Sequence, residues 1–465
     1  MTLVQTVLPL AYLVTGVLLI LGLKFLSSPA HARVGNTLAG IGLFIAVAAT
    51  CFDYHIRVWP LILIGAVIGV PIGYFSAMRV KMTAMPQMVA LFNGAGGGAA
   101  ALVASGEYLK MLSDGKPATV AALLPMLLSV LIGAISFSGS LVAFAKLQEL
   151  MPGRPITYAG QQIVNGLILL AVIVLGGAML AGHATPPLFI GLAIAAALLG
   201  ILAVLPIGGA DMPVVISLLN SFTGVAVAIT GFVLSNSVLI ISGTLVGASG
   251  TLLTMLMAKA MNRSLGNVLF GAFGAVVTAG PAAASGGAVS VRTSSVEDVA
   301  TMLAYARSVI ICPGYGMAVA QAQHAVRELS ANLEKRGVDV EFAIHPVAGR
   351  MPGHMNVLLA EANVPYSQLH EMDEINPQFE HCDVALVIGA NDVTNPAARN
   401  VPSSPIFGMP ILDVDKAAQI VVLKRSMNPG FAGIDNPLYE NPKCSMLFGD
   451  AKDTVTKLAQ AVTAV

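Results

Sequence analysis

Nine long apolar stretches fill the first ~260 residues of this chain and limit what it can fold into. Each is about 20 residues long or longer, which is the length that an α-helix needs to cross a bilayer. Only 10% of the chain is charged, against 56% hydrophobic, a balance typical of membrane proteins. The stretches span roughly 4–26, 36–54, 58–78, 86–109, 120–147, 162–182, 186–206, 212–233 and 237–259.

The charged residues divide the chain in two. Residues 1–264 carry 16 Asp, Glu, Lys and Arg residues, whereas residues 265–465 carry 32. We therefore predict a multi-span α-helical membrane bundle over 1–263, followed by a water-soluble domain. No basic leader precedes the first apolar run, so we expect that run to be a retained helix rather than a signal peptide.

Lysine and arginine in the short loops predict the orientation, because cytoplasmic loops collect them. Eight fall on one side of the predicted bundle and three on the other. With nine spans, this places the N-terminus outside and the C-terminal domain in the cytoplasm. The richer side holds Lys24, Arg33, Arg79, Lys81, Lys146, Arg154, Lys259 and Arg263, and the poorer side holds Arg57, Lys110 and Lys116.

Small residues recur at helical spacing in two of the predicted spans. Such stripes allow helix backbones to approach closely in lipid. We therefore expect both to be packing faces. The first is Gly133, Ser136 and Ser140, and the second is Gly243, Gly247, Gly250 and Thr254.

The centres of the predicted spans contain no Asp, Glu, Lys, Arg or His, although charged groups at membrane depth usually mark ion or proton paths. The nearest carboxylate is Asp211, at the start of the eighth span, and by itself it is typical of a helix N-cap. The uncharged polar candidates for lining a chain of waters are Asn93, Ser136, Ser140, Asn220, Thr223, Thr230 and Ser249.

The last third of the chain has the pattern of an α/β domain. Residues 264–293 are rich in Gly, Ala and Ser and predict a flexible linker. Ser294 or Ser295 then predicts the cap of a short helix with Glu297 and Asp298 in its first turn. Beyond it, strands alternate with helices, which indicates a Rossmann-like, doubly wound parallel sheet over 294–465. The predicted strands are 308–312, 340–345, 384–388, 420–423 and 446–448, and the helices are 314–336, 354–362 and 451–462.

The turn after the first predicted strand matches the Gly-x-Gly-x-x-Gly/Ala fingerprint of dinucleotide-binding folds imperfectly. Gly314 and Gly316 are present, and Val319 stands in the third place. Glycines there permit a tight turn and bring a pyrophosphate close to a helix N-terminus, which favours anions. Because a strand precedes the motif and a helix follows it, we interpret it as a dinucleotide site.

The second predicted strand favours NADP over NAD. NAD binders usually place an acid at its end for the ribose 2′-hydroxyl, whereas this strand ends Ala343-Ile-His345-Pro346. Arg350 follows, and the basic pair and hydroxyl of Lys424-Arg425-Ser426 end a later strand. Such a group suits a phosphate, which Arg can bind bidentately. Taken alone, the segment is also typical of a solvated strand end.

Gly389-Ala-Asn-Asp392 places an amide and a carboxylate after the 384–388 strand. An ordinary Asx-rich turn would have the same composition. In a dinucleotide site, Asp392 would instead lie near the nicotinamide or its ribose.

Other classes of site find no support in the sequence. The four cysteines show no paired spacing, so neither a disulfide framework nor a zinc site is predicted, and no metal site is expected. The chain has no net charge and no basic stripe, which argues against nucleic-acid binding.

Long motifs throughout the chain resemble the beta subunit of proton-translocating NAD(P) transhydrogenase. They are Gly208-Gly-Ala-Asp-Met-Pro213, Lys259-Ala-Met-Asn-Arg263, Pro313-Gly-Tyr-Gly-Met-Ala-Val-Ala-Gln-Ala-Gln323, the run from His345 to Glu361, Gly389-Ala-Asn-Asp392 and Lys424-Arg-Ser-Met427. The resemblance implies tight NADP(H) binding in a reversed orientation across the sheet. It also implies direct hydride transfer from NADH, coupled to proton movement across the membrane into the cytoplasm.

The resemblance implies partners as well. NAD(H) would sit on an alpha subunit of one or two polypeptides, and a second beta subunit would complete a dimer of heteromers in a bacterial inner membrane. It implies nucleotide contacts from five segments. Tyr315–Gly316 and Val347–Gly353 would contact the pyrophosphate side, and Gly389–Val393 would lie near the nicotinamide end. Lys424–Ser426 would hold the 2′-phosphate in a loop that closes as a lid through Phe431, and Asp450 and Ala451 would touch the adenosine part. The full set is Gly314, Tyr315, Gly316, Val347, Ala348, Gly349, Arg350, Met351, Pro352, Gly353, Gly389, Ala390, Asn391, Asp392, Val393, Lys424, Arg425, Ser426, Met427, Asn428, Pro429, Gly430, Phe431, Asp450 and Ala451.

One position departs from that family. Many relatives carry a histidine, thought to take part in proton transfer, where this chain has Asn93. Asparagine does not titrate, so the carrier would lie on the partner's membrane segment, or the path would be a water wire. The residues expected along the path are Asn93, Ser140, Asp211 and Asn220.

Two alternatives belong to other functional classes. An ion channel or transporter regulated by a nucleotide-binding domain would need a selectivity filter or a charged site within the membrane, and neither is evident in the sequence. A membrane scaffold with a degenerate Rossmann domain would have lost Arg350, Lys424 and Arg425, which are present.

Overall fold

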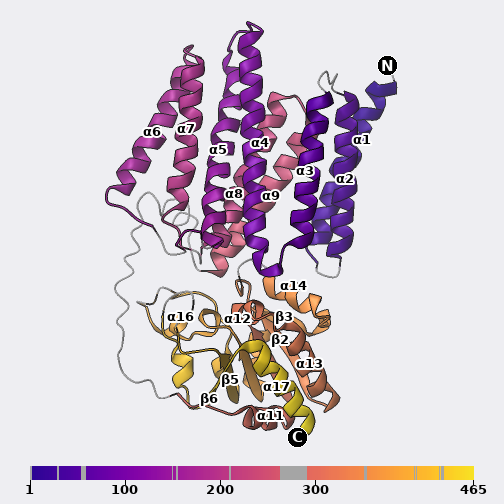
Figure 1. Cartoon of the computed structure of the whole chain (residues 1–465), viewed down its shortest axis with the longest axis vertical. Coiled ribbons are helices and arrows are strands. Elements are labelled where there is room, and N and C mark those ends of the chain that lie inside the picture. Colours follow the sequence, from indigo (N-terminus) through magenta and orange to yellow (C-terminus); the bar gives the residue numbers. More distant parts are fainter. Residues whose placement is uncertain are drawn as a thin grey trace. The chain divides into compact units, whose positions relative to one another are not determined.

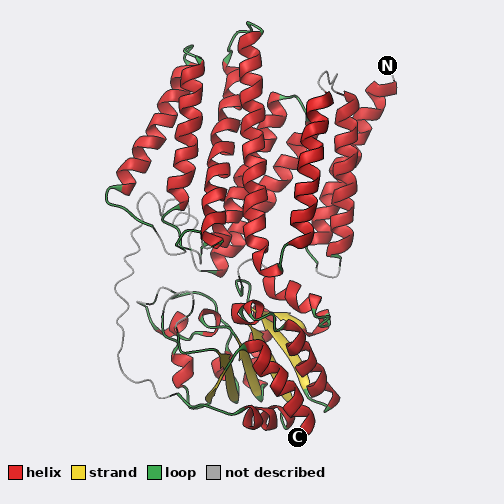
Figure 2. Cartoon of the chain, in the orientation of Figure 1, coloured by secondary structure: helices red, strands yellow, loops and turns green. Residues whose placement is uncertain are grey.

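The computed structural model describes most of the chain, which forms two compact units. The first contains the long helices and the second contains the sheet (Figures 1 and 2). Most of the predicted linker, residues 264–290, lies outside the described residues. The described residues are 3–28, 31–53, 59–148, 150–152, 156–208, 211–261, 291–349, 353–402, 404, 406–428, 430 and 434–465.

Within these ranges, nine helices are long and apolar enough to cross a membrane. This confirms the predicted bundle, with a boundary shift at α2, which begins at Ala32 rather than near residue 36. A short 3₁₀ turn, η1 (Met82–Ala84), precedes α4. The helices are α1 (Leu3–Leu26), α2 (Ala32–Asp53), α3 (Trp59–Arg79), α4 (Met85–Ser113), α5 (Val120–Leu147), α6 (Gln161–Leu180), α7 (Pro186–Val204), α8 (Met212–Val233) and α9 (Ser237–Ala260).

The two predicted small-residue stripes are helix contacts. On α5, a Cβ added to Gly133 would lie 2.6 Å from the carbonyl oxygen of Gly97 on α4. On α9, a Cβ added to Gly243 would lie 2.4 Å from the backbone nitrogen of Ala228 on α8. Both spacings are far below any real Cβ contact, so only glycine permits these approaches. In lipid no hydrophobic force drives helices together, so close packing of this kind holds them instead.

The helices differ sharply in burial. In α8, 61% of the most apolar stretch is buried inside the unit, whereas α3 has no buried residue. The core of the unit therefore lies where α4, α5 and α8 pack together, as they do pairwise.

The C-terminal unit is built on one six-stranded parallel sheet, in the order β3-β2-β1-β4-β5-β6. This confirms the Rossmann-like fold. The order reverses between β1 and β4, which is where such sheets bind ligands. The strands are β1 (Ser308–Pro313), β2 (Asp339–Ile344), β3 (Leu369–Glu371), β4 (Val384–Ile388), β5 (Gln419–Lys424) and β6 (Cys444–Phe448).

The short β3 is absent from the sequence prediction. It has only three residues, and His370 and Glu371 interrupt any apolar run. Pairing with β2 forms it: Phe342 lies opposite Leu369 and Ile344 opposite Glu371. Tertiary pairing rather than local propensity therefore makes this edge strand.

Helices cover the sheet, and α13 packs on α17, which packs on α11 (Figure 1). Ser295 caps α11 with a capping box to Asp298, one of the two caps predicted. Just before it, Ser294 donates its amide to Met446 of β6, and Arg292 accepts from the Met446 amide. The helices are α11 (Val296–Ala304), α12 (Tyr315–Val319), α13 (Gln323–Lys335), α14 (His354–Glu361), α15 (Met372–Ile375), α16 (Ala397–Asn400) and α17 (Ala451–Ala464).

The predicted single helix from the Gly314 turn to residue 336 is wrong, because the structure has two. Gln321 adopts a left-handed φ of 53° and ends α12 after five residues. The local sequence, Met-Ala-Val-Ala-Gln-Ala-Gln, contains no glycine or proline that would signal the break. This weakens one argument for an anion site, since so short a helix contributes little dipole.

Candidate functional site

The strand register brings the predicted site segments to one edge of the sheet. Pro313 at the end of β1 pairs with Ile388 at the end of β4, which pairs with Leu423 of β5. Lys424 then pairs with Phe448 of β6. The loops that follow β2, β1, β4, β5 and β6 therefore lie in that order along the carboxyl edge, on both sides of the point where the strand order reverses.

The Gly-Tyr-Gly turn folds directly against the end of β4. The Gly314 amide donates to the Ile388 carbonyl at 2.9 Å, and the Gly316 amide donates to the Gly389 carbonyl at 2.8 Å. A Cβ at Gly314 would lie 2.4 Å from Ala390 Cα, and one at Gly389, whose φ is +65°, would lie 2.5 Å from Gly316 Cα. Backbone contact across the switch point therefore accounts for all three glycines, without the ligand invoked in the sequence argument.

A buried histidine anchors the loop after β2. His345 accepts a hydrogen bond on Nδ1 from the Val347 amide at 3.2 Å, so its Nε2–H donates to the Pro410 carbonyl at 2.8 Å. Burial lowers the pKa of His345 to about 4, although the bond to Pro410 opposes this shift. The ring is therefore neutral near pH 7. It lies at the end of β2, where NAD binders usually have an acidic residue.

The rest of that loop turns sharply at glycine. Ala348 donates its amide to the His345 carbonyl, and Gly349 has a φ of +104°. A Cβ at Gly349 would lie 2.3 Å from Nδ1 of His354, so the buried His354 ring fills that space. Gly353, at φ +70°, begins α14. Arg350, Met351 and Pro352 lie outside the described residues.

Asn391 and Asp392 form a polar centre at the end of β4. Asn391 Nδ2 donates to Asp392 Oδ1 at 3.1 Å, and the Asn391 backbone carbonyl accepts from Asn436 Nδ2 at 3.1 Å. Beside them, Val393 is buried. The centre is held by long-range contacts, which an ordinary Asx turn does not have.

The loop after β5 crosses this centre. A Cβ at Gly430 would lie 2.2 Å from Asn391 Nδ2 and 2.7 Å from Asp392 Oδ1. Gly430 therefore lies directly over the β4 loop. Its neighbours Pro429 and Phe431, the latter in the predicted lid, lie outside the described residues.

Lys424 at the end of β5 is half-buried, whereas the next four residues, Arg425 to Asn428, are exposed. Lys424 Nζ lies 4.9 Å from the centroid of the Tyr439 ring and 3.5 Å from its hydroxyl. Burial lowers the pKa of Lys424, and the nearby Asp392 and Asp435 carboxylates offset part of this shift. Lys424, Arg425 and Ser426 thus place two cations and a hydroxyl at consecutive positions, and the Tyr439 ring contacts the Lys424 cation.

Asp450 has a structural task. Its carboxylate caps α17 by accepting from the amides of Lys452 at 3.0 Å and Asp453 at 3.4 Å. Ala451, which follows it, is buried. Both lie at the far end of the same edge, next to the end of β5, because the Gly449 amide donates to the Lys424 carbonyl.

In the helical unit, the structure joins two of the four predicted proton-path residues. Asn93 Nδ2 on α4 donates to Ser140 Oγ at 2.9 Å and to Ser136 Oγ at 3.4 Å, both on α5. Ser136 in turn lies 2.5 Å from Thr223 Oγ1 on α8. Asn93 is 7% exposed, and its Oδ1 accepts no hydrogen bond from the described residues. An acceptor that is buried without a donor leaves a place for a water.

The other two path residues lie on α8. Asn220 is partly buried and makes no side-chain hydrogen bond within the described part of the chain. Asp211 occupies the N-cap position, but its side chain makes no capping hydrogen bond, so the cap expected there is wrong. Four positions before it in the chain, the Ile207 carbonyl accepts from Nζ of the buried Lys146 at 2.8 Å.

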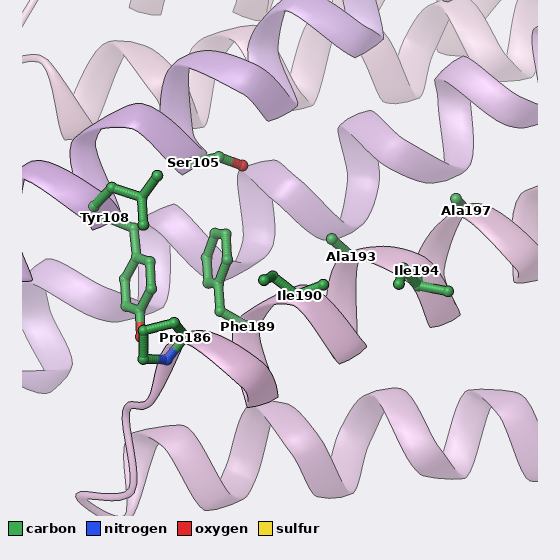
Figure 3. A pocket seen from close by; sticks show the side chains of 9 residues that line it. Ser105, Tyr108, Pro186, Phe189, Ile190, Ala193, Ile194 and Ala197 are labelled. Carbon is green, nitrogen blue, oxygen red and sulfur yellow. The ribbon is translucent and has the colours of Figure 1, made fainter.

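A groove of about 360 Å³ lies between α4 and α7 (Figure 3). Tyr108 and Phe189 stack in it, with ring centroids 4.1 Å apart and planes 8° apart. The side chains that line it are apolar except for the hydroxyls of Tyr108 and Ser105. It therefore lacks the charged groups that a nucleotide needs.

Sequence reasoning missed two buried residues of the sheet edge, Asn436 and Tyr439. A signal for Asn436 was available, because Asn before proline often caps a turn, and here its Oδ1 accepts from the Leu438 amide. Tyr439 reaches Asn391 across 48 positions and has no local signal. The described part of the chain holds no cluster of metal-ligating residues, and its four cysteines are free.

Comparison with known proteins gives one consistent result. The profile of the NAD(P) transhydrogenase beta subunit family matches residues 8–461. Two relatives named NAD(P) transhydrogenase subunit beta, one from Rhodospirillum rubrum and one from a strain of that species, are each 50% identical over 459 residues. Each alignment covers 97% of this chain and 98% of the relative.

Proposed function

Because the chain belongs to the NAD(P) transhydrogenase beta subunit family, we propose that it binds NADP(H) at the carboxyl edge of its sheet and accepts hydride from NADH on an alpha subunit. The observation that carries this proposal is the pairing of Ile388 with Leu423, which brings Lys424, Arg425 and Ser426 at the end of β5 next to the loop of Asn391 and Asp392 after β4. Family membership sets aside the channel and scaffold alternatives.

The donor set at this edge fits NADP. Lys424 supplies a half-buried ammonium, and Arg425 and Ser426 offer exposed donors beside it. This group would hold the 2′-phosphate, and the end of β2 carries the neutral His345 where NAD binders have a carboxylate. When bound, the nicotinamide ring supplies the hydride chemistry, and the protein supplies only binding and orientation.

The remaining contacts follow from position. Asp392 lies under Gly430 and beside the switch point, where it would position the nicotinamide end. The amides of Gly314 and Gly316 already donate to the carbonyls of Ile388 and Gly389. We therefore assign the pyrophosphate side mainly to Tyr315 and to the loop 347–353, and the adenosine side to Asp450 and Ala451.

Proton passage is assigned to the uncharged network of the helical unit. Asn93 and Ser140 would hold a water through the Asn93 Oδ1, which has no donor among the residues that the structure describes, with Asn220 and Asp211 further along the path. Since none of the groups around Asn93 titrates near pH 7, the proton carrier would be water or a partner's side chain.

The assembly completes the proposal. Residues 1–263 would form the proton-translocating domain, 264–293 a flexible linker and 294–465 the NADP(H) domain. NAD(H) would sit on an alpha subunit of one or two polypeptides, within a dimer of such heteromers. The bundle would lie in the bacterial inner membrane with the N-terminus outside and the sheet in the cytoplasm, as the eight-to-three loop charge bias favours.

Calorimetry on the full-length chain tests the cofactor assignment. We expect NADP(H) to bind far more tightly than NAD(H), and Lys424→Ala with Arg425→Ala to weaken NADP(H) about 100-fold or more, because two charge-assisted contacts are lost. The control is the matching pair Lys335→Ala with Arg336→Ala, at the opposite end of α13 from the site. Equal binding of NADP(H) and NAD(H), or a loss as large in the control, would overturn the proposal.

A further inference from the structure

A directional chain of hydrogen bonds runs from the end of β5 to the end of β4. A lysine ammonium only donates, so Lys424 Nζ donates to the Tyr439 oxygen at 3.5 Å. The Tyr439 hydroxyl then has its proton for Asn391 Oδ1, which only accepts. Asn391 Nδ2 donates onward to Asp392 Oδ1 at 3.1 Å. Every proton in the chain therefore points from the cation toward the carboxylate.

The orientation of the Asn391 amide is fixed from two sides. Its Oδ1 accepts from Tyr439 and, at 3.4 Å, from Asn436 Nδ2. Asn436 is itself held, because its Oδ1 accepts from the Leu438 amide at 3.0 Å. With both donors on the oxygen, the nitrogen of Asn391 can only face Asp392.

Tyr439 is 4% exposed and belongs to the main core of the sheet unit. Its ring carries Lys424 on one face, while its hydroxyl accepts from Lys424 and donates to Asn391, the residue that bonds Asp392. In a buried setting, linked hydrogen bonds polarise one another, so a change at one end is felt at the other.

We propose that Tyr439 is a positioning residue that couples the phosphate-binding end of the site at Lys424 to Asp392 at the nicotinamide end. The inference rests on the proposed function, because it assumes that one nucleotide spans both ends. Tyr439 touches the nucleotide at neither end. It sets the Asn391 amide, and through it the Asp392 carboxylate, when Lys424 is engaged.

Tyr439→Phe isolates the hydroxyl, because the ring that packs in the core and lies under Lys424 is kept. NADP⁺ and 2′-AMP are titrated by calorimetry into the full-length chain, as wild type, Tyr439→Phe, Asp392→Asn and the double variant. We expect Tyr439→Phe to weaken NADP⁺ about fivefold and 2′-AMP less than about twofold. In the Asp392→Asn background it should add less than about twofold for either ligand, because the chain then has no charged end to position.

Three results would overturn the inference alone, and a fourth would overturn the proposed function with it. Tyr439 would act only as a support for Lys424 if 2′-AMP were weakened as much as NADP⁺, or if the effect were the same in both backgrounds. If wild type and Tyr439→Phe bound NADP⁺ equally well, the coupling would be contradicted and the proposed function would stand. Wild type that fails to bind NADP⁺ would remove both.

Two further variants guard the test. Tyr305→Phe, at a residue 77% exposed after α11, is the matched control and should change neither affinity. If Tyr439→Phe did not fold, Asn436→Asp would test the same orientation, because it keeps the oxygen that caps Leu438 and loses the amide that donates to Asn391. It should weaken NADP⁺ more than 2′-AMP, and equal losses would contradict the coupling.

Discussion

The two units of this chain use glycine in the same way and polar groups in opposite ways. Gly224 on α8 meets the backbone of Gly247 on α9, just as Gly314 after β1 meets the backbone of Gly389 after β4. Around Asn93 in the helical unit, the polar groups are the hydroxyls of Ser136, Ser140 and Thr223. Around the sheet contact they are charged, as at Lys424 and Asp392.

The difference follows from the surroundings of each unit. Within a bilayer no water can solvate a charge that loses its partner, so neutral groups that bond one another are the tolerable choice. At the sheet edge water reaches Arg425 and Ser426, so a cationic site can stand open for an anion. Glycine contacts supply rigid geometry in both units, and the polar groups decide what each unit can bind or pass.

The largest effect is expected at the glycine of the sheet edge. Gly389→Ala should destabilise the C-terminal unit by about 3–4 kcal/mol, since a left-handed φ of +65° and a backbone contact at 2.5 Å act together. Gly337→Ala shares the positive φ, at +84°, but has nothing within 4 Å. That variant should cost only about 1–2 kcal/mol. Chemical unfolding of the full-length chain, followed by protease resistance of the sheet unit, gives both values, and equal losses would refute the contact argument.

Acid should destabilise the sheet unit through His345. Its folded pKa, about 4, lies below the 6.5 of an unperturbed histidine, so the unfolded chain takes up a proton first as the pH falls. Stability is therefore complete above about pH 6.5 and falls by roughly 3 kcal/mol as the pH drops toward 4. Hydrogen exchange of β2 amides at pH 7.5 and pH 5, corrected for intrinsic rates, measures the part of this loss above pH 5, about 2 kcal/mol.

The matched histidine variants sharpen that test. His345→Gln should remove most of the pH slope, while His324→Gln, at an exposed position of α13, should leave it unchanged. A slope that survived His345→Gln would assign the acid sensitivity to another group.

In the helical unit, Gly224→Ala should cost about 2 kcal/mol or more, because the new Cβ would lie 2.3 Å from the Gly247 nitrogen and force α8 from α9. Gly65→Ala on α3, with nothing within 4 Å, should be neutral or slightly favourable. Thermal unfolding in detergent, followed by size exclusion, compares the pair. Similar shifts would show that the α8–α9 contact carries no special weight.

The smallest effect concerns the neutral hydrogen bonds between helices. Ser129→Ala removes a 2.7 Å bond to Thr230 Oγ1 and should cost about 0.6 kcal/mol, the average for such bonds in membranes. The same assay in detergent detects it as a shift of a degree or two. A loss comparable to that of Gly224→Ala would mean that polar bonds, rather than close backbone approach, hold this unit together.

The sequence predicted the elements whose signal is local. The length of the apolar runs located all nine long helices of the described residues. The apolar run Val384–Ile388 gave the bounds of β4 without error. The sequence prediction failed where tertiary contacts determine the secondary structure. β3 exists because β2 pairs with it, and the break at Gln321 has no breaker residue nearby.

The candidate site was predictable in its parts but not in its connections. Alternating strands and helices place every predicted loop at the carboxyl edge, because parallel strands end together. That Gly314 and Gly316 serve a backbone contact could not be read from spacing, since the same spacing suits a pyrophosphate. Tyr439 was not predicted as part of the site because its partner Asn391 is distant in the chain and only the fold brings them together.

The most direct test of the account is hydride transfer in sealed vesicles that hold the chain together with its alpha subunit. If the neutral network of the helical unit and the charged edge of the sheet serve one coupled reaction, an imposed proton gradient should accelerate NADP⁺ reduction by NADH, and an uncoupler should abolish the acceleration. Lys424→Ala with Arg425→Ala should abolish transfer in either case. Transfer that proceeds at the same rate with and without the gradient would contradict the coupling on which the account depends.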